Sequence, residues 1–350
     1  MRRHFTSSFV FLAFGLVMAG VLGWIWRPEH PLQGAISAVI LCGVLCLLEI
    51  SISFDNALVN ATVVKRMNEK WRHRFLTWGI LISVFGMRIV FPLLIVGVVA
   101  WIGPIEALVM ALREPQRYAE IMRSVHTPVV GFGGAFLLMV ALKHFINHDK
   151  NDHWIDPIEK TLAKLGRFPG VDVLITLIVI GAIGAALHAR QETEHAYHFL
   201  VAAAVGLVTH LAVSGVSSLL TRGDHGGGAS NLPRAGASLF IYLEIQDASF
   251  SFDGVVGAFA ITDNLFFIAI GLGIGAMFVR SLTLFLVEHG TMSKYRYIEP
   301  GAFYAIGALA MTMLLSALHE MGELVPGLLS MGIIVISLIA SIRHNRQMGR

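Results

Sequence analysis

The sequence predicts an all-α, polytopic membrane protein, and three observations support this prediction. Hydrophobic residues make up 55% of the 350-residue chain, and its mean hydropathy is +0.71. Charged residues make up only 14%, against about 25% in an ordinary soluble protein. Apolar runs close to the roughly 20 residues that cross a bilayer as a helix recur along the chain.

Ten such runs predict about ten transmembrane helices. They lie at about 8–26, 34–64, 75–101, 128–146, 171–188, 196–220, 237–261, 265–287, 302–318 and 324–342. The first run follows a basic N-terminus, as a secretory signal does, and its cleavage would leave nine helices. The run is long and no small-x-small cleavage site closes it, so we expect it to be kept. The mixed-charge segment 103–127 predicts an interfacial helix or an ordered loop.

Basic residues outside the runs predict the orientation of the helices. The densest basic loop is 65–74, and the tail 343–350 is also basic. Positively charged loops stay on the cytoplasmic side. We therefore expect an integral protein of the inner, cytoplasmic membrane with both termini in the cytoplasm.

Composition and missing motifs exclude several classes of function. The formal net charge of +3 is small and lies in loops, so we expect no nucleic-acid partner. The sequence has no P-loop, no Rossmann fingerprint and no nucleophile–base set, and we therefore expect neither an enzyme nor a bound cofactor. The two cysteines, Cys42 and Cys46, lie four apart in an apolar run and are expected to be core residues.

Two similar acidic stretches lie inside apolar runs. Residues 49–56 read EISISFDN and residues 247–254 read DASFSFDG, so both follow the order acid, any, Ser, apolar, Ser, Phe, Asp. An ionisable side chain in the membrane costs several kcal/mol, about 2.5–3.5 on the mildest scale, and usually marks a functional site.

Under the predicted orientation, the two acidic stretches lie on antiparallel helices, as in an inverted-topology repeat. We expect a single membrane domain over 1–350. Within it we expect a first repeat at 34–146, connecting loops and helices at 147–236, a second, inverted repeat at 237–320, and a last span with a basic tail at 324–350.

The spacing within each stretch predicts a broken helix. Asp55 follows Glu49 by six residues, which places the two side chains about 120° apart on a straight helix. Asp253 and Asp247 have the same spacing. Both acids of a pair can reach one ligand only if the helix unwinds, so we predict an interruption at Ser-Phe-Asp in both copies.

The candidate metal-binding residues all offer oxygen. They are Glu49, Asp55, Asn56, Asp247 and Asp253. Carboxylate and amide oxygens suit hard divalent cations such as manganese, magnesium or calcium, and no cysteine or clear histidine beside them suggests zinc or copper(I). Four carboxylates in one cavity would repel one another unless a cation or protons neutralised them, which suggests a proton-coupled cycle.

Secondary candidates surround this set. Glu244 and Asn60 are reserve ligands, although Glu244 could equally pair with an arginine to fix helix register. Arg88 and Arg280 lie in the runs that follow the two acidic stretches; they could supply counter-charge to the empty site or serve only as structural partners. Asp263 and Asn264 lie at a span end and are expected to be helix caps or to line an access path. The His/Asp-rich segment 148–153 is expected to be a solvated loop, or else to collect cations.

These residues resemble the TerC-type integral membrane proteins of the LysE-like transporter superfamily. The resemblance is carried by 53–59 (SFDNALV) and 250–255 (FSFDGV), and 260–264 with 270–282 supports it. It covers the second to fourth and the seventh to ninth runs. It implies manganese efflux or tellurite-resistance phenotypes, with the acidic residues named above binding the metal. This chain differs in its length, its additional spans and its His/Asp-rich loop.

The leading hypothesis is a secondary transporter that exports a divalent cation, with manganese as the favoured substrate. One alternative is a membrane scaffold with a metal-sensing role in a stress response of the tellurite-resistance type. A second is a LysE-like exporter of a small organic cation. The expected partners are the metal ion and the lipid bilayer, and homo-oligomers are compatible with the sequence.

Overall fold

The protein is an all-α, polytopic membrane protein, as the sequence predicts. The computed structural model describes residues 2–65, 67–146, 154–222, 232–290, 294–319, 321 and 324–347, and all regular structure in these ranges is helical. Nine helices of the described part are long and apolar enough to cross a membrane. The seventh predicted span, 237–261, lies in the 30-residue helix Leu232–Ile261, which is not among the nine and which contains three acidic residues.

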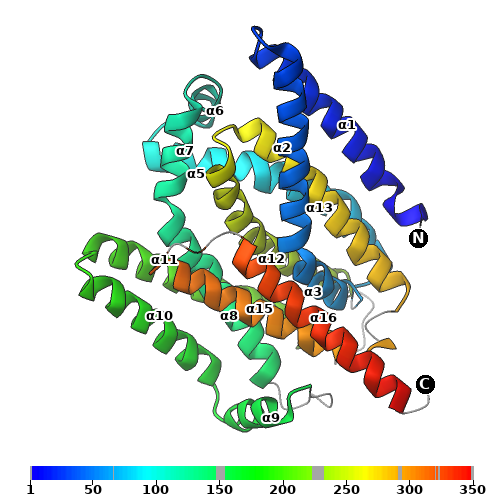
Figure 1. Ribbon diagram of the computed structural model, residues 1–350. Helices are drawn as coiled ribbons and strands as arrows, with labels where there is room; N and C mark the ends of the chain where they lie inside the picture. Colours follow the sequence, from blue (N-terminus) through cyan, green and yellow to red (C-terminus); the bar gives the residue numbers. More distant parts are fainter. Residues whose placement is uncertain are drawn as a thin grey trace.

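The helices follow the predicted runs closely (Figure 1). In chain order they are α1 (Arg2–Trp26), α2 (Pro31–Ile52), α3 (Phe54–Val64), α4 (Glu69–Leu81), η1 (Ile82–Val90), α5 (Phe91–Ala100), α6 (Pro104–Arg113), α7 (Pro115–Ser124), α8 (His126–Ile146), α9 (Asp156–Leu165), α10 (Val171–Ala189), α11 (Thr193–Arg222), α12 (Leu232–Ile261), α13 (Leu265–Glu288), α15 (Ile298–Ser316) and α16 (Leu324–Gln347). The two short helices α6 and α7 confirm the ordered segment expected at 103–127. The segments 148–153 and 223–231 lie outside the described residues.

The predicted interruption is confirmed in the first acidic stretch and wrong in the second. Helix α2 ends at Ile52, Ser53 leaves helical geometry with φ −94° and ψ 13°, and α3 begins at Phe54. Helix α12 instead runs unbroken through 247–254. The Ser249 hydroxyl donates to the Ile245 carbonyl within the helix, and Gly254 also lies within it, because the cost of a glycine in a helix, about 1 kcal/mol, is too small to break a long helix. Nothing in this stretch removes a backbone hydrogen bond, so the helix continues.

A π-helix interrupts the third span. Segment η1 lies between α4 and α5, and the backbone N–H of Phe91 donates to the Gly86 carbonyl, five residues back. Pro92 explains the change, because its ring has no N–H and clashes with the carbonyl four residues before it, which belongs to Arg88. π-Helical segments inside longer helices often lie at functional sites, and this one carries Arg88.

Two packed groups of helices form the core. Helix α8 packs against α11 and α15, and α13 packs against α1 and α2. Gly275 of α13 permits the close contact with α2, since a Cβ there would lie 2.5 Å from the Glu49 Cβ. Figure 1 shows α10 and α11 side by side at one edge of this bundle.

Helices α2 and α12 run in opposite directions, as the sequence predicts. Gly34 at the start of α2 and Thr262 at the end of α12 line one cavity. Glu49 near the end of α2 and Asp247 in the middle of α12 line another. The two acidic stretches therefore approach the same cavity from opposite ends of the molecule.

Candidate functional site

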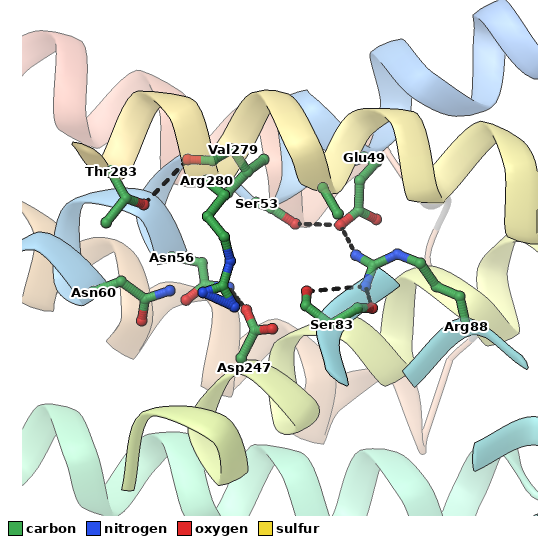
Figure 2. A pocket seen from close by; sticks show the side chains of 11 residues that line it. Glu49, Ser53, Asn56, Asn60, Ser83, Arg88, Asp247, Val279, Arg280 and Thr283 are labelled. Atoms are coloured by element: carbon green, nitrogen blue, oxygen red, sulfur yellow. Dashed lines mark hydrogen bonds and ion pairs between the residues drawn. The ribbon is translucent and has the colours of Figure 1, made fainter. Parts of the chain in front are cut away.

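A small cavity lies where the break between α2 and α3 faces η1, α12 and α13 (Figure 2). Its volume is about 10 Å³, which is about the space that one water molecule occupies. Polar side chains form most of its lining: Glu49, Ser53, Asn56, Asn60, Ser83, Arg88, Asp247, Arg280 and Thr283. The cavity is too small for an organic molecule in this conformation, and it is rich in oxygen.

Glu49 is held on one side of the cavity by a buried ion pair. Its carboxylate contacts the Arg88 guanidinium, and the two side chains are 3% and 2% exposed. The Ser53 hydroxyl donates to the same Glu49 oxygen at 3.0 Å. Arg88 also donates to the backbone carbonyl of Ser83. Ser53 is the residue at which α2 ends, so the helix break itself supplies a hydrogen-bond donor to Glu49.

Asp247 lies on the other side of the cavity. The Asn56 side-chain amide donates to Asp247 Oδ1, which joins the start of α3 to α12. Figure 2 shows Arg280 reaching from α13 toward Asp247, and the two charges interact electrostatically. Asp247 Oδ2 is buried and has no hydrogen-bond partner among the described residues, and the same is true of Asn60 Oδ1.

Arg280 is also held by groups outside the cavity. It lies 3.8 Å from Glu244 Oε1, donates to the Phe75 carbonyl at 2.9 Å and lies over the Phe75 ring at 4.1 Å from the ring centre. Gly79 leaves room for this arrangement, since a Cβ there would lie 2.5 Å from Glu244 Oε1. Thus each of the two arginines pairs with a carboxylate on a neighbouring helix.

The structure brings together most of the candidate residues named from the sequence. Glu49, Asn56, Asp247, Asn60, Arg88 and Arg280 all line the cavity. Glu244 does not line it and reaches it only through Arg280. Asp55 and Asp253 have their backbones in α3 and α12, and their side chains lie outside the described residues. In the described part of the chain, no three His, Cys, Asp or Glu side chains gather as a metal centre would.

Asp263 lies away from this cavity, at the turn between α12 and α13. It forms an ion pair with Arg123 of α7, which also donates to the Phe259 carbonyl at the end of α12. The cap of α13 is Asn264, whose side chain accepts from the backbone N–H groups of Phe266 and Phe267. The expectation of a cap therefore applies to Asn264 and is wrong for Asp263.

Sequence analysis named Ser53 only as part of the acidic stretch and missed two further polar residues of the lining, Ser83 and Thr283. Each lies close in sequence to one of the buried arginines: Ser83 precedes Arg88 by five residues, and Thr283 follows Arg280 by three. A hydroxyl residue three positions from a membrane arginine was a usable signal for Thr283, because the two share one face of an α-helix. Ser83 lies on the side of Arg88 because the π-helix has a wider turn, and the sequence did not indicate that turn.

Comparison with known proteins gives one match. A family described as "Protein of unknown function (DUF475)" matches residues 54–348, most of the chain. No curated protein and no solved structure matches it. The matched region begins at Phe54, the first residue of α3, and includes every cavity residue except Glu49 and Ser53.

Proposed function

We propose that this chain, which belongs to the DUF475 family, is a secondary transporter that exports a divalent metal cation, with manganese as the favoured substrate. We further propose that it lies in the cytoplasmic membrane with both termini in the cytoplasm, as the basic loops indicate. The first turn of α1 and the last turn of α16 lie on the same side of the molecule, at the right in Figure 1, which is consistent with this orientation.

The observation that carries the proposal is the oxygen-lined cavity with unsatisfied acceptors. An unpaired buried oxygen is costly, and two oxygens of the described lining, Asp247 Oδ2 and Asn60 Oδ1, are buried without a hydrogen-bond partner. A cation placed there would satisfy both, with the Asp247 carboxylate supplying negative charge. Glu49 is available on the opposite wall once Arg88 releases it.

The size and chemistry of the cavity favour an inorganic ion. A volume of about 10 Å³ accommodates a single dehydrated ion and excludes an amino acid or other organic cation in this conformation. Ligands that are all oxygen suit manganese, magnesium or calcium. Manganese is favoured among these by the resemblance to TerC-type proteins that the acidic stretches carry.

The two arginines fit a cycle in which protein cations replace the substrate. In the described conformation Arg88 neutralises Glu49, and Arg280 lies near Asp247 and Glu244. A divalent ion entering the cavity would compete with both guanidinium groups for the carboxylates. Release of the ion would restore the ion pairs or protonate the acids, so that buried carboxylates are never left uncompensated.

Manganese flux into proteoliposomes tests the proposal directly. Purified protein is reconstituted with a manganese-sensitive dye trapped inside, and Mn²⁺ is added outside. Glu49→Gln and Asp247→Asn should each reduce the flux by roughly tenfold or more, as loss of a metal-site group does. Asp263→Asn is the matched control, because it removes an acid from the exposed ion pair with Arg123, and it should transport like wild type.

The alternatives give different outcomes in the same assay. A metal-sensing scaffold would bind Mn²⁺ without moving it, so wild type would show no flux above empty liposomes. An exporter of organic cations would ignore Mn²⁺ and would carry a labelled diamine or amino acid. Flux in Glu49→Gln and Asp247→Asn equal to that of wild type would reject the proposed site.

A further inference from the structure

A second cavity lies near the start of α2, at the end of the molecule that the proposed orientation places outside the cell. It has a volume of about 370 Å³ and is lined by residues of α1, α2, α6, α7, α13 and the turn between α12 and α13. We call it the vestibule. The α6–α7 pair closes one of its sides through Ala111, Leu112 and Pro115. The vestibule is large enough for a hydrated ion, unlike the cavity at Glu49.

The vestibule and the cavity at Glu49 border the same pair of helices. Leu41 of α2 and Phe267 of α13 line the vestibule, whereas Glu49 of α2 and Ala276 of α13 line the smaller cavity. Leu41 and Glu49 are eight residues apart, which is roughly 12 Å along a helix. A direct connection therefore requires only about two turns of the α2–α13 contact to separate.

Small and apolar residues fill these two turns. A Cβ on Gly271 would lie 2.5 Å from the Leu45 Cβ, and one on Gly275 would lie 2.9 Å from the Cys46 carbonyl. Leu45 belongs to a buried apolar cluster that also contains Val255, Phe259, Ile268 and Leu272. These apolar side chains lie between the two cavities and separate them, as a closed gate requires. We call this cluster the plug.

Both cysteines of the chain lie in this stretch of α2 and are buried. Cys42 Sγ lies 3.5 Å from the carbonyl of Phe267, a vestibule residue. Cys46 lies one turn before Glu49 and close enough to interact with its charge. The two thiols therefore mark successive positions between the vestibule and the site.

The charge of the vestibule suits release of a cation. Its described lining includes Arg27 and the polar residues Ser37, Thr262 and Asn264, and it includes no carboxylate. A cation that reached this space would meet a positive side chain and oxygen atoms without negative charge, so it would be held weakly. An exporter needs such weak binding on its external side.

We infer that the vestibule is the external mouth of the transport path, where the cation is rehydrated and released, and that the path from Glu49 follows the α2–α13 contact past Cys42 and Cys46. This inference rests on the proposed function, because it assigns a route to the proposed cargo. It makes the plug the external gate, which is closed in the described conformation.

Thiol labelling of the native cysteines tests the route. Cys42→Ala leaves Cys46 as the single thiol, and Cys46→Ala leaves Cys42. Each variant is exposed to a membrane-impermeant methanethiosulfonate reagent in right-side-out or inside-out vesicles, with and without a Mn²⁺ gradient, and labelling is read as an increase in intact mass. During efflux both cysteines should label from the external side, with Cys42 the faster because it is nearer the vestibule.

Leu45→Ala provides a second measurement. Removing a buried leucine weakens the closed plug, so external labelling of Cys46 without Mn²⁺ should accelerate by roughly tenfold or more. Leu137→Ala is the matched control, because Leu137 is equally buried in the separate cluster around α8, and it should leave the labelling rate unchanged.

The two readouts separate failure of the route from failure of the cargo. Manganese flux without external labelling, or with labelling from the cytoplasmic side alone, would overturn the route and leave the transport proposal standing. External labelling with no manganese flux would reject manganese and support the route for another solute. Absence of both would reject both proposals.

Discussion

The Arg88→Met substitution leaves the Glu49 carboxylate buried with the Ser53 hydroxyl as its remaining described hydrogen-bond donor. The two side chains of the pair are 2% and 3% exposed, so bulk solvent does not hydrate the carboxylate that loses the guanidinium. Removing one partner of a buried ion pair costs about 3–5 kcal/mol, because the other charge is left uncompensated. We therefore expect this substitution to be strongly destabilising.

Manganese should reverse part of this loss. If the cation and Arg88 compete for Glu49, then in Arg88→Met the cation no longer has to break an ion pair to reach the carboxylate. Binding to the folded state then stabilises the protein by about 2.7 kcal/mol when free Mn²⁺ reaches 100 times its dissociation constant. Wild type should gain less at the same concentration, because Mn²⁺ must first displace the guanidinium.

Unfolding in detergent, followed by intrinsic fluorescence during heating, measures both effects in a series of MnCl₂ concentrations at constant ionic strength. Arg117→Met is the matched control, because its partner Glu114 forms an exposed pair, with side chains 65% and 54% exposed. Such pairs contribute at most about 1 kcal/mol. The reasoning would be refuted if Arg88→Met melted like Arg117→Met, or if Mn²⁺ stabilised wild type and Arg88→Met equally.

Two further substitutions probe the scaffold. Gly275→Ala should destabilise the protein by about 1–3 kcal/mol in the same melting assay, because the new Cβ would lie 2.5 Å from the Glu49 Cβ. Gly43→Ala is the control, because a Cβ there meets nothing within 4 Å, and it should not lower the melting temperature. Equal melting of the two variants would contradict the close contact. Glu159→Met, which has no oxygen acceptor, should weaken α9 by about 1 kcal/mol, the typical cost of a lost cap, since the Glu159 carboxylate accepts from the backbone N–H of Trp154 at 2.9 Å. Faster hydrogen exchange confined to 154–165 would show this, and unchanged exchange would refute it.

The break between α2 and α3 lies where the spacing of Glu49 and Asp55 predicted it. Six residues separate Glu49 from Asp55, and no straight helix turns both toward one ligand. The same spacing does not interrupt α12, which runs unbroken and places Asp247 on the cavity. A spacing argument assumes that both acids share one ligand, and only the three-dimensional packing decides whether they do.

Pairing of Glu244 with an arginine was among the sequence alternatives, but which carboxylate each buried arginine contacts could not be predicted. Arg88 lies 39 residues from Glu49 in sequence, and their contact depends on how η1 packs beside α2. The basic segment 65–74 was expected to be a loop, but its residues from Glu69 onward begin α4, with Asn68 as the cap. Positive charge marks the membrane interface whether the backbone there is a loop or a helix, so the orientation argument does not depend on this difference.

The four described charged side chains that line the cavity at Glu49 cancel one another: Glu49 and Asp247 are acidic, and Arg88 and Arg280 are basic. An electrically balanced empty carrier moves no net charge when it changes conformation, so membrane voltage leaves that step unaffected. A bound divalent ion adds two charges, and each charge that crosses the full field is worth about 2.3 kcal/mol per 100 mV. Under the proposed function, voltage would therefore act on the loaded half of the cycle, and a negative cell interior would oppose export unless protons move inward in exchange.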